Sequence, residues 1–314
     1  MSIAKTNEPV TVFVTGATGK IGRDLVKIMA KDAETGAVQL RLGVREIEKA
    51  QSLLGPGITA VPFDFDHPER HQHALGNAKR LLLLTGYTVD MLTQAKSLID
   101  AAKKTHVEYL VHIGAYSTPD TGVAHLGWHQ LIEAYIERSG LNWTHLRPNW
   151  FMQNTPLGPD TTVFQDGILY GFLPAERKVS WISTGDIAAV AATVLRSPER
   201  HINRSYPLAR EAKSYAEISD LLSECVGKPV RYQQLPIANM LAGLIDSGME
   251  PVYATSVVEV ARLVSSGGMP EANDVDTAVL DHLIGSSGTS WGSYIAQSLP
   301  RNASAAALSY ERPL

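Results

Sequence analysis

The sequence predicts an α/β protein built on a parallel sheet that helices cover on both faces. Three observations support this class. Short apolar runs of about five residues alternate with helical segments, each run is apolar at successive positions, and a glycine-rich turn follows the first run. Right-handed connections between such strands give a doubly wound topology.

The expected strands fall in the first half of the chain. Most are rich in Val, Ile, Leu or Phe, and Gly, Pro or polar residues flank them. The expected strands are Val10–Val14, Leu40–Val44, Ala60–Phe63, Arg80–Leu84, Tyr109–Ile113 and Trp143–Arg147.

Helical spacing fills the intervals between these strands. In the first interval Ile21, Leu25 and Ile28 share one helical face, which is typical of a helix packed on a sheet. The expected helices are Ile21–Ala30, Glu46–Leu54, Met91–Lys104 and His125–Ser139.

The alternation weakens after Pro148. Short strands or loops are expected over Phe164–Phe172 and Lys178–Ile182, and the Ala/Ser-rich end is expected to be loose. Asp186 and Ser214 are the expected N-caps of two helices, Ser214 with a capping-box Glu217. The expected helices are Asp186–Leu195, Ser214–Val226, Ile237–Ile245 and Ser256–Val264.

We therefore expect two domains. Residues 1–155 would form a nucleotide-binding domain. Residues 156–314 would form a smaller, mostly helical lobe packed on it, with some segments returning to the sheet.

Composition narrows the class of protein. The 314 residues are 44% hydrophobic and 19% charged, which excludes a wholly disordered chain. A net charge of −4 gives no indication of binding to nucleic acid or to an anionic membrane. Cys225 is the single cysteine, so an internal disulfide and a multi-cysteine metal site are excluded.

The sequence also indicates where in the cell the protein is expected. No apolar stretch approaches the ~20 residues that a membrane span needs. Residues Met1–Pro9 lack the apolar core of a signal peptide. The expectation is a soluble cytoplasmic protein, a monomer or a homodimer, that binds a small molecule and no metal.

The strongest motif is the turn after the first strand, Thr15-Gly16-Ala17-Thr18-Gly19-Lys20-Ile21-Gly22. Gly16 permits a tight turn, Gly19 lets the backbone approach a diphosphate, and Gly22 lets the helix press on the strand. The N–H groups and dipole of the helix that begins near Lys20 and Ile21 favour an anion. The alternative is a purely structural glycine turn.

The end of the second strand predicts the choice of cofactor. A site for NAD usually has an acidic residue there, which binds the ribose 2′-hydroxyl. This strand ends in Arg45, which favours the 2′-phosphate of NADP(H) over NAD(H). Arg45 as a solvated surface charge is the alternative, and the adjacent Glu46 could reverse the preference.

Other expected cofactor contacts lie where later strands end, because ligands of such sheets bind at the carboxyl ends of strands. Asp64 and Phe65 are expected near an adenine, and Thr85 and Gly86 near the ribose and diphosphate. Tyr87, Tyr116 and Pro148 are expected near the nicotinamide. Ordinary strand-end loops are the alternative for each of these residues.

Several segments together resemble the NmrA-like branch of the atypical short-chain dehydrogenase/reductases. They are Val14–Gly19, Val44-Arg45, Ser139-Gly140-Leu141, Leu146–Asn154, Val179–Ile182 and Asp186-Ile187-Ala188. The first is shared across the superfamily, whereas the segment from Arg147 to Asn154 is particular to this branch. The resemblance implies a Rossmann-type domain, an NADP(H) site and a small C-terminal substrate lobe. Members include quinone, azo-dye and triphenylmethane-dye reductases, and regulators that bind dinucleotide without turnover.

The Tyr-x-x-x-Lys pair of typical short-chain dehydrogenases is missing from the sequence. That pair supplies a tyrosine acid, so its absence weighs against ordinary alcohol–ketone chemistry. Where many relatives carry a lysine, on the helix after the fifth strand, this chain has His129, with Glu133 four residues later. His129 is therefore the first catalytic candidate, and a structural histidine is the alternative.

Further candidates follow the fifth and sixth strands. Tyr116 and Ser117 stand where short-chain dehydrogenases place a serine that polarises the substrate. Trp150, Phe151 and Asn154 could line a flat, apolar substrate pocket, or could pack a hinge between lobes.

The function predicted from these features is reduction by NADPH of a planar conjugated molecule, such as a quinone, azo compound, imine or dye. Such acceptors need little acid catalysis from the protein, because the cofactor carries the chemistry. Two alternatives stay open: a non-catalytic NADP(H)-sensing regulator, and an isomerase or epimerase that retains its cofactor.

Overall fold

A seven-stranded sheet with the strand order β10-β6-β5-β4-β1-β2-β3 organises the first part of the fold. The structure is a computed structural model and describes residues 8–298, except residues 54, 56, 156, 159 and 275. The pairs β1–β2, β1–β4, β2–β3, β4–β5 and β5–β6 are all parallel. The strands are β1 (Val10–Val14), β2 (Val38–Val44), β3 (Ile58–Pro62), β4 (Arg80–Leu83), β5 (Tyr109–Ile113), β6 (Asn142–Pro148) and β10 (Arg204–Leu208).

The chain divides into two compact units, and both are discontinuous in sequence. Unit 1 comprises residues 1–115, 126–147 and 187–206, and unit 2 comprises residues 116–125, 148–186 and 207–314.

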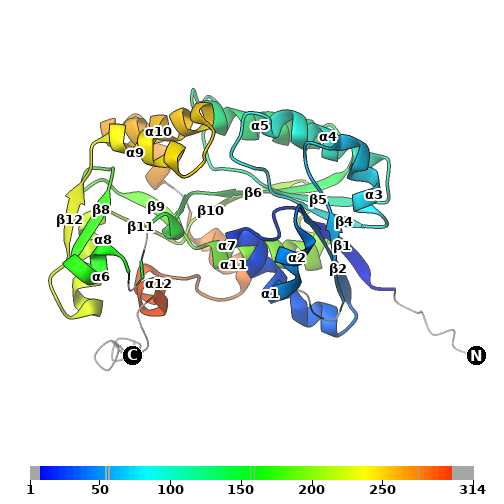
Figure 1. The fold of residues 1–314 in the computed structure, drawn as a ribbon, viewed down its shortest axis with the longest axis horizontal. Helices are drawn as coiled ribbons and strands as arrows, with labels where there is room; N and C mark the ends of the chain where they lie inside the picture. Colours follow the sequence, from blue (N-terminus) through cyan, green and yellow to red (C-terminus); the bar gives the residue numbers. More distant parts are fainter. Residues whose placement is uncertain are drawn as a thin grey trace, which may run out of the picture. The chain divides into compact units, whose positions relative to one another are not determined.

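Helices cover both faces of the sheet of unit 1. Figure 1 shows α4 and α5 on one face, and α1 and α7 on the other. The central strands are therefore apolar on both sides, and Val12, Leu42 and Leu82 are fully buried. The helices are α1 (Lys20–Glu34), α2 (Ile47–Ala50), α3 (His71–Leu75), α4 (Met91–Lys103), α5 (Ala124–Glu137) and α7 (Thr184–Arg196), with 3₁₀ turns η1 (Gln51–Leu53), η2 (Pro68–Arg70) and η4 (Pro198–Arg200).

Unit 2 has two small sheets and several helices. One sheet has the order β11-β9-β7, and the other pairs β12 with β8 in parallel. Trp181 and Trp291 are fully buried and meet edge to face, with ring centroids 5.1 Å apart, and Tyr215 packs on Trp181. The elements are β7 (Trp150–Phe151), β8 (Ile168–Gly171), β9 (Val179–Ile182), β11 (Glu211–Lys213), β12 (Arg231–Gln234), α6 (Thr162–Asp166), α8 (Tyr215–Val226), α9 (Ile237–Asp246), α10 (Pro251–Ser266), α11 (Ala278–Ile284), α12 (Trp291–Ser298), η3 (Met152–Asn154) and η5 (Pro270–Asn273).

The α/β prediction is confirmed, and all six expected strands are present within a few residues of their expected bounds. The capping box of α8 is also confirmed: the Ser214 hydroxyl accepts the Glu217 N–H, and the Glu217 carboxylate accepts the Ser214 N–H. The short helix α3 and the edge strand β10 were not predicted. The segment Asn302–Leu314, expected to be loose, lies outside the described residues.

The expectation that Asp186 caps α7 is wrong. The helix begins at Thr184, and the hydroxyl of Ser183 accepts the Asp186 N–H at 3.0 Å. The Asp186 carboxylate instead accepts hydrogen bonds from the N–H and the hydroxyl of Thr289, at 2.8 Å and 3.0 Å. Its role is to hold the loop before α12.

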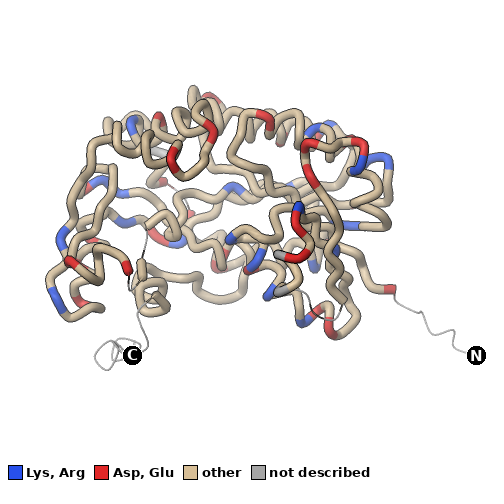
Figure 2. Tube along the Cα trace, viewed as in Figure 1, with Lys and Arg blue, Asp and Glu red and all other residues tan. Residues whose placement is uncertain are grey.

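The distribution of charged residues and the search for membrane-spanning helices agree with the sequence analysis. Figure 2 shows basic and acidic residues interspersed along the trace of both units. Among residues 8–298 as described, no helix combines the length and the apolar character that a membrane span requires.

Candidate active site

The glycine-rich turn between β1 and α1 leaves no room for side chains. Gly16 has φ +63°, in the left-handed region that favours glycine. A Cβ on Gly22 would lie 2.2 Å from the carbonyl oxygen of Gly16 and 2.7 Å from Cα of Ala17. The first turn of α1 therefore packs directly on the backbone of the turn.

The N-terminus of α1 is suited to an anion. Its N-cap is Gly19, in extended conformation, which supplies no side-chain cap, and the first turn contains no acidic residue. The helix has 15 residues, and its dipole and first-turn N–H groups favour a phosphate at this end. With the close-packed glycines beside it, this cradle fits a dinucleotide diphosphate, and the candidates Thr18, Lys20 and Ile21 belong to it.

Thr15 joins the ends of β1 and β4, a role that the sequence analysis missed. Its hydroxyl accepts the Leu84 N–H at 2.8 Å and lies 2.9 Å from the Leu84 carbonyl oxygen, to which it donates. Thr85, Gly86 and Tyr87 follow directly, so this hydroxyl places them next to the glycine turn. Tyr87 is 62% exposed, which leaves its ring accessible to a ligand.

The second and third strands bring the other cofactor candidates to the same edge of unit 1. Arg45 is exposed and directly follows β2, with Glu46 next to it as the N-cap of α2. Asp64 and Phe65 follow β3, and the Asp64 carboxylate accepts the Asp66 N–H at 3.2 Å. Because β1 to β4 run parallel, all their carboxyl ends meet here.

His129 lies on α5 and is 7% exposed. Its Nδ1 is 3.4 Å from Nε2 of His112, which lies on β5. One turn later on α5, the Glu133 carboxylate forms a two-point ion pair with the Arg147 guanidinium. His129 is therefore one member of a buried polar group under α5.

The sequence analysis named Glu133 but missed two members of this group, the histidines of β5 and β6. His145 on β6 is the register partner of His112, and both side chains are fully buried. Burial holds the pKa of His112 well below its usual value and lowers the pKa of His145 to about 3, so both rings are neutral. The one available signal was a histidine inside each of two expected buried strands, Tyr109–Ile113 and Trp143–Arg147.

His125, which precedes His129 by one helical turn, has a structural role in unit 2. Its backbone N–H donates to the hydroxyl of Ser256 at 2.8 Å, and that hydroxyl lies 2.8 Å from its Nδ1. This one hydroxyl therefore contacts both the backbone and the ring of His125. The pair fastens the start of α5 to α10.

The remaining candidates lie in unit 2. The Tyr116 N–H donates to the Pro148 carbonyl oxygen at 3.0 Å, so these two residues are neighbours. The Tyr116 hydroxyl donates to the Asp274 carbonyl oxygen at 3.4 Å, and the half-buried Ser117 comes next. Trp150 and Phe151 form β7, where Trp150 meets Trp181 edge to face at 5.9 Å. Asn154 is exposed at the end of η3.

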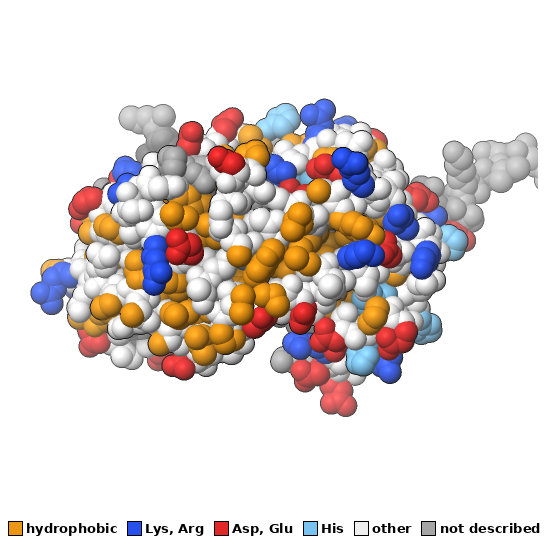
Figure 3. All heavy atoms as spheres, turned by 90° about the horizontal axis from the view of Figure 1, so that it is seen from above, with side chains coloured by type: hydrophobic (Ala, Val, Ile, Leu, Met, Phe, Trp, Pro, Cys, Tyr) orange, Lys and Arg blue, Asp and Glu red, His pale blue; other side chains and the backbone are white. Residues whose placement is uncertain are grey.

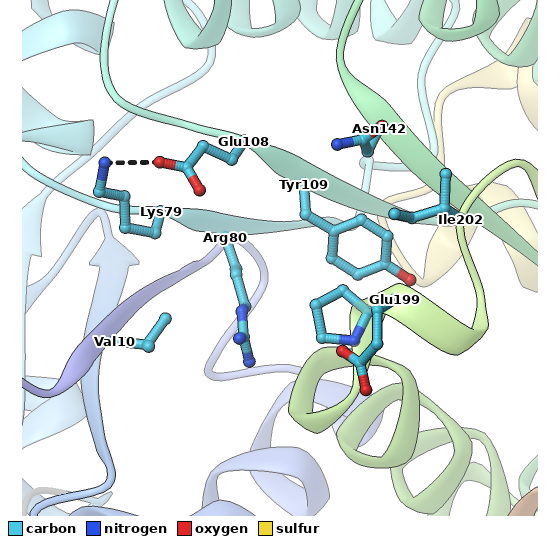
Figure 4. A pocket seen from close by; sticks show the side chains of 9 residues that line it. Val10, Lys79, Arg80, Glu108, Tyr109, Asn142, Glu199 and Ile202 are labelled. Atoms are coloured by element: carbon cyan, nitrogen blue, oxygen red, sulfur yellow. Dashed lines mark hydrogen bonds and ion pairs between the residues drawn. The ribbon is translucent and has the colours of Figure 1, made fainter. Parts of the chain in front are cut away.

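Two concave features of unit 1 lie away from these candidates. A cavity of about 220 Å³ opens at the amino ends of β1, β4, β5 and β6, where Lys79 and Glu108 form an ion pair at 2.6 Å (Figure 4). A shallow groove between α4 and α5 is lined by Leu92, Ile99, Leu131, Ile132, Tyr135 and Lys96. Figure 3 views the molecule from the side of these helices, where hydrophobic side chains reach the surface. Neither feature is at the carboxyl edge of the sheet.

Comparison with known proteins agrees with this geometry. The model of the NmrA-like family matches residues 8–290. The chain is 31% identical to an NAD(P)H azoreductase of Xenophilus azovorans over 254 residues, 80% of this chain and 86% of the relative. It is 28% identical to quinone oxidoreductase 2 of Escherichia coli over 276 residues, 87% of this chain and 93% of the relative.

A solved structure is similar as well. It is the NADPH-dependent quinone oxidoreductase of Escherichia coli in complex with NADPH, with a TM-score of 0.76 and 26% identity. The match covers 91% of this chain and 99% of that one.

Proposed function

Because the chain belongs to the NmrA-like family, we propose that it is an NADPH-dependent reductase of planar conjugated molecules such as quinones, azo compounds, imines or dyes. The observation that carries the proposal is the close-packed glycine turn at the uncapped N-terminus of α1, with Arg45 at the neighbouring strand end. The names of the two relatives, an azoreductase and a quinone oxidoreductase, support the reaction class.

The residues of unit 1 would hold the cofactor. The turn from Gly16 to Gly22 would bind the diphosphate, and Arg45 would bind the 2′-phosphate, a contact that would favour NADP(H) over NAD(H). Asp64 and Phe65 would contact the adenine, and Thr85 and Gly86 the ribose. When bound, the nicotinamide of NADPH supplies a hydride.

Residues of this chain would orient and polarise the acceptor. In the proposed site, His129 contacts cofactor or substrate, while Tyr116 and Ser117 polarise the acceptor. Tyr87 and Pro148 would border the nicotinamide. Unit 2 would act as the substrate lobe, in which the ring faces of Trp150 and Phe151, with Asn154, recognise a flat molecule.

A cofactor-oxidation assay tests the proposal. Purified full chain is mixed with NADPH or NADH and, in turn, a naphthoquinone, an azo dye and a triphenylmethane dye, while cofactor absorbance is followed. The expected result is oxidation of NADPH with at least one acceptor, slower with NADH.

Each other outcome has a separate meaning. Tight NADPH binding by calorimetry without turnover of any acceptor would overturn the reductase and favour a dinucleotide-sensing regulator. Dinucleotide that stays bound through purification and is not consumed would favour an isomerase or epimerase. No binding of either dinucleotide by folded protein would overturn the cofactor site itself.

A further inference from the structure

Three side chains from separate parts of unit 1 converge beneath α5. His112 lies on β5, His145 is its register partner on β6, and Glu133 lies on α5. Their potential ligand atoms, one from each residue, all lie within 4.8 Å of one another. The side chains of both histidines are inaccessible to solvent, and Glu133 is 3% exposed. The three positions form no spacing motif, which is why the sequence predicted no metal site.

Ring nitrogens in this cluster lack partners. Nδ1 of His112 and both ring nitrogens of His145 are buried and make no hydrogen bond. Glu137 Oε1 lies 3.5 Å from Nε2 of His145, beyond good hydrogen-bond length. A buried polar atom without a partner costs about 1–3 kcal/mol, so folded proteins rarely retain one unless a water or an ion completes it.

The surroundings orient these atoms as they do at known metal sites. Nε2 of His112 faces Nδ1 of His129, so with its proton on Nε2 the His112 ring keeps the Nδ1 lone pair toward the cluster. Trp143 stacks on the His145 ring at 4.2 Å and fixes its plane.

The Glu133 carboxylate is held in place, and the space beside it is left open for an ion. The Arg147 guanidinium holds Glu133 in place, with Nε 3.0 Å from Oε1. Gly114 leaves the space open: a Cβ there would lie 3.1 Å from Glu133 Oε1 and 3.4 Å from His112 Nδ1. Any larger residue would therefore crowd two of the three donors.

We propose that His112, Glu133 and His145 bind a divalent transition-metal ion, with Zn²⁺ the best match. Two imidazoles and one carboxylate form a borderline donor set that zinc favours. Zinc bonds of about 2.0–2.1 Å would draw the donors to about 3.4 Å from one another, a movement within side-chain reach. The ion would tie β5, β6 and α5 together and complete the unpartnered nitrogens.

Arg147 and the metal ion would compete for the carboxylate of Glu133. Its guanidinium already neutralises Glu133, so an ion must share that charge. Replacing Arg147 with an uncharged side chain should therefore strengthen zinc binding, whereas an arginine that only supports the fold would have no such effect.

The test measures retained metal. Full chain is refolded from urea with Zn²⁺, because the cluster is buried, then passed over a chelating resin and assayed for zinc per chain. Wild type and a His73→Gln control, which alters an exposed histidine of α3, are expected to keep one zinc ion. His112→Leu and His145→Leu are expected to keep none.

Three further measurements accompany the metal assay. Circular dichroism checks that each leucine variant is folded, as expected from the unpartnered nitrogens that it removes. Co²⁺ in place of zinc should give wild type a visible d–d absorption band that the two leucine variants lack. Zinc should raise the melting temperature of Arg147→Met more than that of wild type.

Three results would overturn the proposal. Wild type that retains no zinc would leave the cluster a purely polar network of the core. Folded His145→Leu that retains as much zinc as wild type would assign the metal to surface histidines, an adventitious ion only. A zinc effect on melting that is no larger in Arg147→Met would contradict the shared carboxylate. None of these readouts depends on the reductase activity.

Discussion

Arg147 and Glu133 form a two-point ion pair in the interior of unit 1, with Nη2 of the arginine 2.5 Å from Oε2 of the glutamate. The carboxylate side chain is 4% exposed and the arginine is 32% exposed. Removing the arginine would leave a buried carboxylate without its cation. We expect Arg147→Met to lower the free energy of unfolding by about 3 kcal/mol, measured by urea unfolding without metal.

The matched control is Lys96→Met, which breaks the exposed pair between Lys96 and Asp100, itself 2.7 Å long. It should cost at most about 0.5 kcal/mol. The double variant Glu133→Gln/Arg147→Met should recover much of the loss, because it removes both charges. Equal costs for Arg147→Met and Lys96→Met would contradict the importance of burial here.

We expect His125 to make the stability of unit 2 depend on pH. Burial lowers the pKa of His125 from its ordinary 6.5 to about 4. In acid the unfolded chain binds a proton there before the folded chain does, so stability falls as pH drops from 6.5 toward 4. At about pH 5 this loss is about 2 kcal/mol. His125→Gln should lose less stability on acidification, measured by urea unfolding at about pH 7.5 and about pH 5.

Gly243→Ala serves as the control for pH. Gly243 is exposed in α9, and a Cβ there would meet no atom within 4 Å. The variant should gain about 1 kcal/mol from helix propensity at both pH values. If His125→Gln retained the full wild-type pH dependence, the assigned role of His125 would be wrong.

Gly22→Ala should weaken dinucleotide binding strongly. The added Cβ would lie 2.2 Å from the Gly16 carbonyl oxygen and would force the turn apart. We expect the Kd for NADPH to rise by about a hundredfold or more, a change of about 2.7 kcal/mol, measured by calorimetry. Gly122→Ala, with no atom within 4 Å of its Cβ, should bind as wild type does. Unchanged binding by Gly22→Ala would remove this turn from the cofactor site.

Arg45→Ala should change which cofactor is preferred. Loss of a charge-assisted contact to the 2′-phosphate costs about 1.5–3 kcal/mol, so the Kd for NADPH should rise about tenfold to a hundredfold. The Kd for NADH should stay the same, as should both values in Arg70→Ala, an exposed arginine of η2. A parallel loss of NADH affinity would show that Arg45 does not read the 2′-phosphate.

His129→Ala should reduce turnover without reducing cofactor binding. If His129 contacts the reacting groups, kcat should fall by about a hundredfold for an acceptor that the wild type reduces. The Kd for NADPH and the circular dichroism spectrum should stay as in wild type. His73→Ala, at an exposed position of α3, is the matched control. A wild-type kcat in His129→Ala would exclude His129 from the reaction.

Sequence alone predicted much of unit 1, because its signals are local. The buried strands are continuous apolar runs, and β1 and β5 occupy the expected residues. The glycine-rich turn was predictable because its backbone geometry requires glycine at Gly16 and Gly22, and those glycines form a recognisable motif. Capping by Ser214 was predictable because its partner, Glu217, is only three residues away in the sequence.

The errors and omissions come from contacts between distant residues. Asp186 looked like a cap, yet its partner is Thr289, 103 positions later. The group of His112, Glu133 and His145 depends on strand register and on the rotation of α5, and neither leaves a spacing pattern. The role of His125 likewise depends on Ser256, which is 131 positions away.

The discontinuity of the two units limits how the protein can be dissected. The chain passes from one unit to the other after residues 115, 125, 147, 186 and 206. A fragment that stops at residue 155 would lack α7 and the edge strand β10, so its β6 would present unsatisfied backbone groups. Such a truncated gene product should therefore self-associate, and expression trials or domain swaps with relatives need to transplant interleaved segments rather than halves.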